Sequence, residues 1–170
     1  GNTWDAAALE ATLLGPTLRF EADCAFALVG GQALATLDGK EQPQHETLFA
    51  RRGQELAVAA MQVGARVYVA IAGGLIADEI LGSVSTNLQA GFGGFAGRAL
   101  QTGDVLQYVP QKTNPLKTPD KFRVPMSSSW AVHACVAAET HLLDDTSLAQ
   151  LFDTNWVIDR RGDRMGLRLL

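Results

Sequence analysis

Small polar side chains and glycines gather in one stretch of the sequence, residues 82–98. Gly82-Ser-Val-Ser-Thr-Asn87 supplies three hydroxyls and an amide, and Gly91-Phe-Gly-Gly-Phe-Ala-Gly-Arg98 supplies four glycines and an arginine. Such donors, together with backbone N–H groups that glycine leaves uncovered, bind phosphate or carboxylate oxygens. The candidate substrate- or phosphate-binding residues of this stretch are Ser83, Ser85, Thr86, Asn87 and Arg98.

The same stretch also has a purely structural interpretation. It contains no Gly-x-x-x-x-Gly-Lys-Ser/Thr motif, and no periodic helix follows the glycines, so neither a P-loop nor a dinucleotide fingerprint is indicated. The alternative is an ordered loop across the end of a barrel, pinned to the core by Phe92 and Phe95. Residue spacing alone favours this ordered loop, and the binding interpretation stays open beside it.

Two further groups of charged residues are candidates for chemistry. Glu139, His141, Asp144 and Asp145 could be read as metal ligands or an acid/base set. Without paired-ligand spacing, however, the two aspartates are better explained as helix N-terminal residues. The pair Asp163-Arg164 either pins a strand end by an ion pair or contacts an anionic ligand. No metal site is predicted.

Composition excludes several classes of protein. The chain has 170 residues, 47% hydrophobic and 19% charged, which fits one globular domain or two small subdomains. A net charge of −4 with no basic run longer than two residues predicts no nucleic-acid partner, and no apolar stretch is long enough to predict a membrane span. Cys24 and Cys135 lie in apolar runs and are predicted to be reduced core thiols of a cytoplasmic protein.

Turn signals at short intervals, including Gly30-Gly31 and Val63-Gly64, predict a mainly β fold. Alternating apolar residues predict half-buried strands, and the uninterrupted run Val67–Ile71 predicts a central one. Residues 1–109 are predicted to form a first β-barrel-like subdomain, 110–129 an extended connector rich in proline and lysine, and 130–170 part of a second β subdomain. In this last part we expect a strand over 130–138 and a short helix over 145–152.

The two ends suggest a portion of a longer protein. The chain opens at Gly1 without a methionine, and it closes on the apolar run Met165–Leu170, which would normally continue into a turn.

Several motifs in this order resemble those of the biotin-dependent carboxyltransferase-type family. That family includes one of the subunits of 5-oxoprolinase, the KipA-type antagonist of a kinase inhibitor, allophanate hydrolase subunit 2 and a region of urea carboxylase. The resemblance covers nearly the whole chain. It is carried by Gly1-Asn2, Ala6–Glu10, Leu14–Phe20, Ala72–Gly74, Leu81–Leu88, Gly97–Leu100, Gly103-Asp104 and Asp163–Gly166.

The resemblance implies cyclophilin-like β-barrel subdomains with one or two short helices. It also implies two partners, a smaller related subunit and a third subunit, with which the chain would open 5-oxoproline, a small-molecule acid, to glutamate at the expense of ATP. In that reaction the hydroxyls and amide of residues 83–87 would bind substrate or phosphate oxygens, and Arg98 would neutralise charge. The resemblance assigns no catalytic residue in this chain, so the catalytic residues stay unknown.

Two other family activities remain as alternatives. One is a regulatory protein of the KipA type that binds a kinase inhibitor and has no chemistry of its own. The other is a carboxyltransferase; because the chain lacks a Met-Lys-Met motif, biotin would come from another protein. The chain departs from the family pattern at Val84, where an arginine is usual, and at Ala137-Ala-Glu139, where Gly-Pro-Gln is usual.

Overall fold

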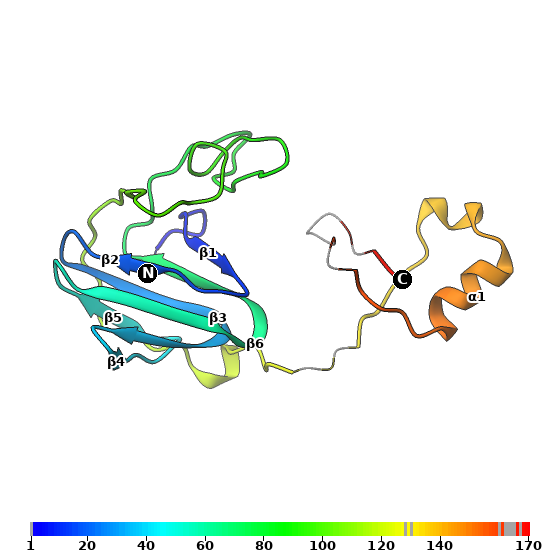
Figure 1. The fold of residues 1–170 in the computed structure, drawn as a ribbon, viewed down its shortest axis with the longest axis horizontal. Helices are drawn as coiled ribbons and strands as arrows, with labels where there is room; N and C mark the ends of the chain where they lie inside the picture. Colours follow the sequence, from blue (N-terminus) through cyan, green and yellow to red (C-terminus); the bar gives the residue numbers. More distant parts are fainter. Residues whose placement is uncertain (1, 128, 130, 160, 162–165, 167) are drawn as a thin grey trace. The chain divides into compact units, whose positions relative to one another are not determined.

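The computed structural model describes every residue except 1, 128, 130, 160, 162–165 and 167. The chain divides into two compact units, Gly1–Ser129 and Trp130–Leu170 (Figure 1). The first unit holds all six strands of an antiparallel sheet, and the second holds the one α-helix among the described residues. The predicted mainly β class is therefore confirmed.

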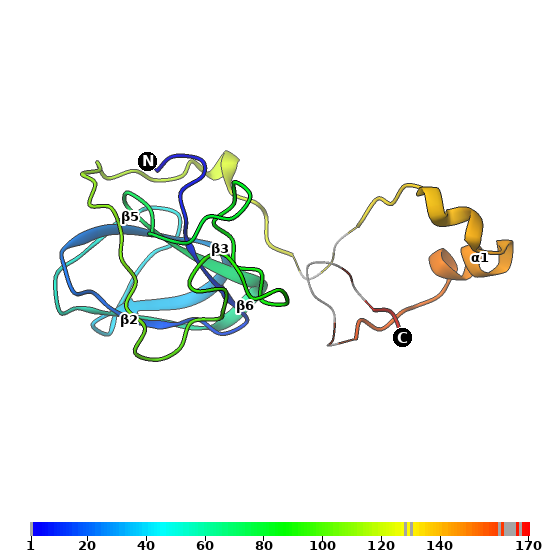
Figure 2. The ribbon, with the colours of Figure 1, turned by 90° about the horizontal axis from the view of Figure 1, so that it is seen from above.

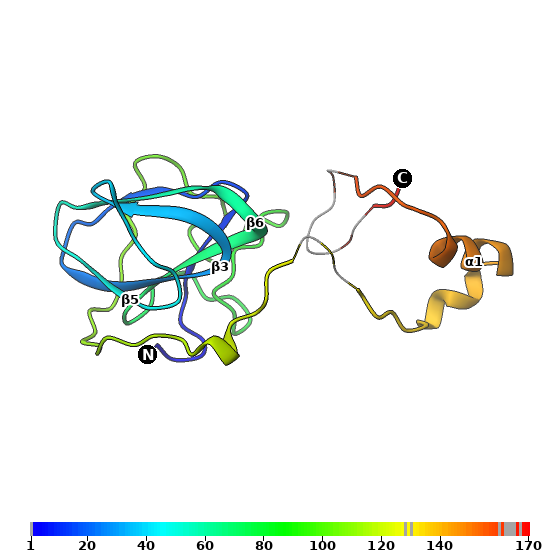
Figure 3. The same cartoon turned by 90° about the horizontal axis from the view of Figure 1, so that it is seen from below.

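The sheet is organised around two long strands. β3 and β6 pair with each other, β1 and β2 pair with β6, and β4 and β5 pair with β3. β3 curves strongly along its length, and β6 follows it (Figures 2 and 3). The strands are β1 (Leu9–Thr12), β2 (Thr17–Arg19), β3 (Cys24–Leu37), β4 (Lys40–Glu41), β5 (Thr47–Ala50) and β6 (Glu55–Ile71).

The glycines at the middle of β3 and β6 lie at an irregularity in the pairing of these two strands. The turns predicted at Gly30-Gly31 and Val63-Gly64 are therefore wrong. The register between the two strands shifts after Gly30, so both strands continue past their glycines. A Cβ on Gly31 would lie 2.8 Å from the carbonyl oxygen of Val63, and one on Gly64 would lie 3.0 Å from the Cα of Gly31. The two backbones therefore approach too closely for side chains, which is a reason for glycine inside a strand.

The core lies within the curved sheet, where inward-facing apolar residues alternate with others along β3 and β6. Phe26, Leu28 and Leu56 are at most 2% exposed, and Phe20 packs against Phe26 with ring centroids 5.2 Å apart. In the run Val67–Ile71, predicted as a central strand, the first, third and fifth residues are buried and the other two are half-buried. A strand between two neighbours shows this pattern when one face covers the core.

The segment 110–129, predicted as an extended connector, runs beside β5. The Thr47 N–H donates to the Leu116 carbonyl at 2.7 Å, and the Thr118 N–H donates to the His45 carbonyl at 2.7 Å. The Lys117 ammonium lies 3.7 Å from the Glu46 carboxylate. These bonds satisfy backbone groups at an edge that would otherwise be open to another strand. The role of this segment as a subdomain boundary stays a prediction.

The described part of the second unit contains α1 (Asp145–Asp153), preceded by a 3-10 helix over Ala138–Leu142. The helix was predicted, and Asp144 caps it by accepting a hydrogen bond from the Ser147 N–H at 2.7 Å. The strand predicted over 130–138 is wrong, because residues 131–137 form no strand. Assignment of 130–170 to a second β subdomain stays a prediction.

Candidate functional site

Residues 75–108 leave the sheet after β6 and form the glycine lobe, drawn in green in Figure 1. Both ends of the lobe are fixed to the same place. The chain turns at Gly73-Gly74, and Leu75 then bridges both Ala7 and Tyr108. The Ile76 N–H donates to the Gln107 carbonyl at 2.8 Å. The lobe is thus a long loop whose two ends lie side by side and are hydrogen-bonded to each other at the sheet.

Within the glycine lobe, the two halves of the stretch selected from the sequence pair with each other. Asp78 and Gly94 exchange two backbone hydrogen bonds of 2.7 and 2.9 Å, and the Asn87 N–H donates to the Phe92 carbonyl at 2.9 Å. A tight turn closes at Ile80 and Ser83, which also exchange two bonds. Backbone hydrogen bonds therefore order the region, as the structural interpretation predicted. Phe92, which was predicted to pin the loop to the core, is instead 40% exposed.

The glycines of the lobe allow its two halves to touch. Gly93, Gly94 and Gly97 are buried. A Cβ on Gly93 would lie 2.6 Å from the Ser85 carbonyl oxygen, and one on Gly94 would overlap the Thr86 hydroxyl. A side chain at either position would force the two halves of the lobe apart. Glycine is therefore needed at Gly93 and Gly94 for the two backbone segments to pack against each other.

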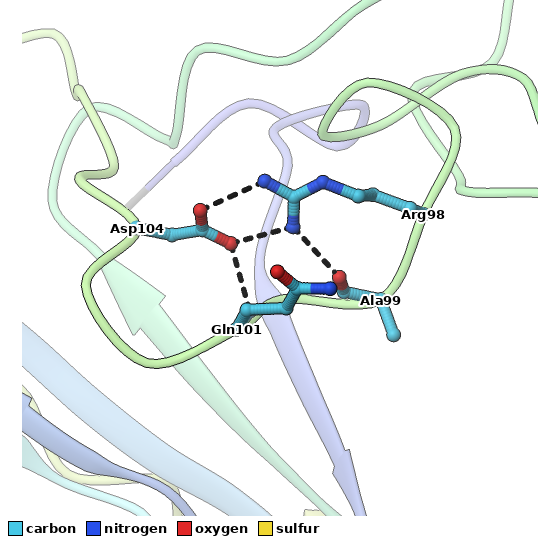
Figure 4. A network of polar contacts seen from close by, with 4 residues as sticks. All are labelled: Arg98, Ala99, Gln101 and Asp104. Carbon is cyan, nitrogen blue, oxygen red and sulfur yellow. Dashed lines mark hydrogen bonds and ion pairs between the residues drawn. The ribbon is translucent and has the colours of Figure 1, made fainter.

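Arg98 and Asp104 form a bidentate ion pair across the last turn of the lobe (Figure 4). Arg98 Nη1 lies 2.7 Å from Asp104 Oδ2 and Nη2 lies 2.8 Å from Oδ1, while Nη1 also donates to the Ala99 carbonyl at 2.9 Å. The guanidinium carbon lies 5.0 Å from the centre of the Phe95 ring. A planar guanidinium holds a carboxylate in this geometry with high specificity.

The ion pair changes the acidity of the carboxyl group. Hydrogen bonds from Arg98, and secondly from the Gln101 N–H, lower the pKa of Asp104 from 3.8 to about 2. The same contact raises the pKa of Arg98. The positive charge of Arg98 is therefore already balanced inside the lobe. Its predicted role of neutralising a ligand's charge stays a prediction.

The other residues selected from the sequence lie on the outer part of the lobe. Ser83, Ser85 and Asn87 are exposed, and Thr86 is half-buried beside Gly94. Ser83 Oγ accepts from the Ser85 N–H at 3.2 Å, and Asn87 Oδ1 accepts from the Ala90 N–H at 3.0 Å. Three of the four residue 83–87 donors are thus exposed on one short segment, and the fourth, Thr86, packs against the other half of the lobe.

Among the described residues, the Arg98 guanidinium makes its hydrogen bonds with Asp104 and Ala99 and none with these donors. The remaining candidates, Asp163 and Arg164, lie outside the described residues.

Sequence reasoning missed the partner of Arg98. The sequence did hold a signal for this partner, Asp104: it has the opposite charge, lies six residues after Arg98, and directly follows the turn glycine Gly103. It also missed two hollows of the first unit, neither of which the predicted donors line. One of about 290 Å³ is lined by Ile76, Asp78, Phe95, Ala96, Val105 and Gln107. One of about 340 Å³ is lined by Asp23, Cys24, Ala72, Tyr108, Gln111 and Lys112.

The cysteines differ in environment. Cys24 is half-buried, and burial, followed by the nearby Asp23 charge, raises the pKa of its thiol to about 11. At neutral pH this thiol therefore stays protonated and unreactive. Cys135 is exposed, so its prediction as a core thiol is wrong.

Neither a metal centre nor a membrane span emerges from the described residues. Within them, no three His, Cys, Asp or Glu side chains gather as a metal site would require. No helix that the structure describes is long and apolar enough to cross a membrane. Asp144, one of the acidic candidates, is occupied as the cap of α1, and the hydrogen bonds from Ser147 lower the pKa of its carboxyl group.

The family model for the carboxyltransferase domain, subdomain A and B, matches residues 1–170. The chain belongs to this family. It is 34% identical over 169 residues to a 5-oxoprolinase subunit of Escherichia coli, covering 99% of this chain and 54% of that protein. It is 33% identical over 180 residues to urea amidolyase of Saccharomyces cerevisiae, covering 100% of this chain and 10% of that protein. The resemblance identified from the sequence motifs is confirmed.

A solved structure agrees with this assignment. The chain superposes on the urea carboxylase of Kluyveromyces lactis with a TM-score of 0.88 and 32% identity, covering 100% of this chain and 16% of that one. The carboxyltransferase-domain chain therefore spans about half the length of the Escherichia coli 5-oxoprolinase subunit and a small part of the urea-acting relatives.

Proposed function

We propose that this carboxyltransferase-domain chain is part of a subunit of a complex that opens 5-oxoproline to glutamate at the expense of ATP. The observation that carries the proposal is the 34% identity to the Escherichia coli 5-oxoprolinase subunit along 99% of the chain, with half of that relative covered. The complex would include a smaller related subunit and a third subunit, and it would act in the cytoplasm.

The chemistry requires activation of a lactam, because an amide carbonyl resists attack by water. The γ-phosphoryl group of ATP passes to the lactam oxygen, and ADP leaves. Water then adds to the ring carbon, and the C–N bond breaks as the nitrogen takes a proton. A second water hydrolyses the resulting acyl phosphate to glutamate and phosphate. ATP would be bound with the help of the partner subunits.

The exposed donors of the glycine lobe support a role in binding oxygens during these steps. The Ser83 and Ser85 hydroxyls and the Asn87 amide lie within one short, backbone-ordered segment. Fixed donors stabilise oxygens on which negative charge develops, because no reorganisation is needed when the charge appears. Arg98 is held in the same lobe by its pair with Asp104 and its contact with Phe95.

The test is 5-oxoproline-dependent ATP hydrolysis by the full-length protein with its partner subunits, with glutamate release followed in the same sample. Coupled turnover that disappears when this subunit is omitted supports the proposal. We expect the double variant Ser85→Ala, Asn87→Ala to lower turnover at least about tenfold. The matched control is Thr102→Ala, which removes an exposed hydroxyl from another turn of the same lobe.

A second candidate function is carboxyl transfer, which the superposition on urea carboxylase favours. In that reaction a carboxyl group moves from biotin on a separate carrier protein to an acceptor amide. Biotin-dependent carboxylation of urea without 5-oxoproline turnover would replace the first proposal with this one. A stable complex with a partner and no turnover of either kind would overturn both and favour the KipA-type regulatory function.

A further inference from the structure

The hollow of about 290 Å³ lies where three segments of the glycine lobe meet. These segments are the part just after β6, the buried glycine turn and the part that returns to the sheet. They are held together by backbone hydrogen bonds, from Asp78 to Gly94 and from Ile76 to Gln107. The volume of the hollow is near the lower limit of typical small-molecule sites, so it suits a ligand of few atoms. Its lining includes Ile76, Asp78, Gly94, Phe95, Val105 and Gln107.

Part of this lining is apolar surface that the protein itself leaves uncovered. Ile76 is 54% exposed and Val105 is 69% exposed. Phe95, which also lines the hollow, is half-buried. Removing such surface from water is favourable, and a ligand gains this free energy when it brings a hydrocarbon chain of its own. The apolar lining therefore favours a ligand with an alkyl part.

The polar part of the lining consists of hydrogen-bond acceptors without partners. Asp78 contributes a carboxylate, and Gln107 contributes the oxygen of a primary amide. In the part of the chain that the structure describes, neither side chain makes a hydrogen bond or an ion pair. Both oxygens are therefore free to accept hydrogen bonds from a ligand.

The charges of the lobe determine the sign of the ligand. Residues 75–108 contain three carboxylates, on Asp78, Glu79 and Asp104, against one cation, Arg98. The Arg98 guanidinium is balanced by Asp104 at 2.7 Å, which leaves Asp78 and Glu79 uncompensated within the lobe. Among the residues that line the hollow, none carries a positive charge. An anion is therefore repelled, a neutral group gains nothing from the charge, and a cation is attracted.

We infer that this hollow binds a small alkylammonium group, which is an ammonium on a short hydrocarbon chain. The ammonium donates to the Asp78 carboxylate and the Gln107 amide oxygen and keeps its third N–H for water. The hydrocarbon chain covers Ile76 and Val105. The inference goes beyond the proposed function and does not depend on it, because both the charge and the chain of the ligand follow from the lining alone.

The test is an NMR titration of the ¹⁵N-labelled full chain at pH 7 with n-butylammonium, 1-butanol and butyrate, which present a positive, a neutral and a negative end on chains of similar length. We expect n-butylammonium to shift the Phe95 and Ala96 amide signals and the Gln107 side-chain signals, with a Kd of about 1–10 mM. Because an ion pair with an exposed carboxylate is weak, 1-butanol should bind only about three- to fivefold more weakly, and butyrate more weakly still. Absence of these shifts, or binding of 1-butanol or butyrate as tight as that of n-butylammonium, would overturn the inference.

Two variants test the assignment to Asp78. Asp78→Asn should weaken n-butylammonium binding about three- to fivefold and change 1-butanol binding less than twofold, because only the ion pair is lost. Glu79→Gln is the matched control, since it removes the adjacent exposed charge outside the lining and should change binding less than twofold. The bonds between Asp78 and Gly94 use backbone atoms only, so an unchanged Gly94 amide signal shows that the lobe stays folded. Equal weakening by the two variants would show that general charge holds the ligand, and would overturn the inference.

The same chemical group occurs on free amines and on lysine side chains, and one more titration distinguishes these sources. Nα-acetyl-lysine methylamide presents the ammonium as it occurs in a protein. Tighter binding of this compound than of n-butylammonium would identify a lysine side chain as the ligand, and weaker binding would identify a free amine. In either case Asp78→Asn must weaken the binding. Binding of both compounds that is unaffected by Asp78→Asn would overturn the inference.

Discussion

The sheet and the glycine lobe are stabilised by different interactions. In the sheet, large apolar side chains such as Phe26, Leu56 and Val69 are almost fully buried. In the lobe, the buried residues among 75–108 are glycines, and its larger apolar side chains, such as Leu81 and Leu88, are mostly exposed. Apolar burial therefore holds the sheet, whereas backbone hydrogen bonds and one ion pair hold the lobe.

This difference has a functional meaning. A region with few buried apolar contacts opens locally at a lower free energy than the core, and binding segments are commonly drawn from such regions. The sheet fixes both ends of the lobe through the bridges of Leu75 to Ala7 and Tyr108, so an opening of the outer part leaves the stem in place.

The largest expected effect compares one phenylalanine in each region. Phe26→Ala should lower the free energy of unfolding by about 3–5 kcal/mol, because it leaves a cavity in the core, where Phe26 is 2% exposed. Phe92→Ala, at a lobe position that is 40% exposed, should cost about 1 kcal/mol. Urea denaturation of both variants measures the difference. Similar losses of unfolding free energy in the two variants would contradict the conclusion that apolar burial stabilises the sheet but not the lobe.

Glycine substitution should affect the lobe through its backbone packing. Gly94→Ala combines a positive φ of 60° with overlap on the Thr86 hydroxyl, so we expect a loss of about 2–3 kcal/mol in lobe stability. Gly82→Ala is the control, since its φ is 75° but its Cβ would point into open space, and strain alone costs about 1 kcal/mol. Hydrogen exchange at the Asp78 amide would report each effect. Equal effects would argue against close backbone contact at Gly94.

The ion pair predicts an acid-sensitive lobe. The pKa of Asp104 in the folded protein is about 2, below its ordinary 3.8. The stabilisation from this carboxylate is therefore complete above about pH 4 and is lost as the pH falls toward 2. In the variant Arg98→Met, ¹³C NMR of the Asp104 carboxyl group should show its titration midpoint shifted upward, toward 3.8. An unchanged midpoint would mean that Arg98 does not set this pKa.

The smallest expected effect is a gain in stability. Leu81 is 98% exposed and has a φ of 53° in the turn that it forms with Gly82. Asparagine tolerates this left-handed conformation better than leucine, so Leu81→Asn should stabilise the protein by about 0.5 kcal/mol. Thermal unfolding measures it, with Leu88→Asn as the exposed control. A loss of stability would show that Leu81 makes a contact that the turn geometry does not explain.

Much of the sheet could be predicted from the sequence. The alternating segments around Leu18, Leu37 and Leu56 and the run Val67–Ile71 all lie in or at strands, because a half-buried strand leaves a period-two pattern. The great length of β3 and β6 could not be predicted from the sequence. A glycine at a register shift within a strand has the same local sequence pattern as a glycine in a turn. Only the partner strand, here Gly64 facing Gly31, distinguishes the two.

The candidate site was predicted in part. The ordered loop at residues 82–98 and the position of its hydroxyls on one segment follow from local sequence. The Arg98–Asp104 pair and the hollow at Asp78 depend on how the lobe closes on itself, through bridges such as Asp78 to Gly94. Contacts of that kind have no local pattern. The helix at Asp145–Asp153, in contrast, was predicted correctly because its capping aspartate is a local signal.

The most direct test of the difference between the two regions is native-state hydrogen exchange of the full chain in increasing urea. We expect lobe amides, such as those of Asp78 and Gly94, to exchange through an opening of lower free energy and weak urea dependence, while the paired amides of β3 and β6 exchange only with global unfolding. Exchange of lobe and sheet amides at one common free energy and urea dependence would contradict this expectation.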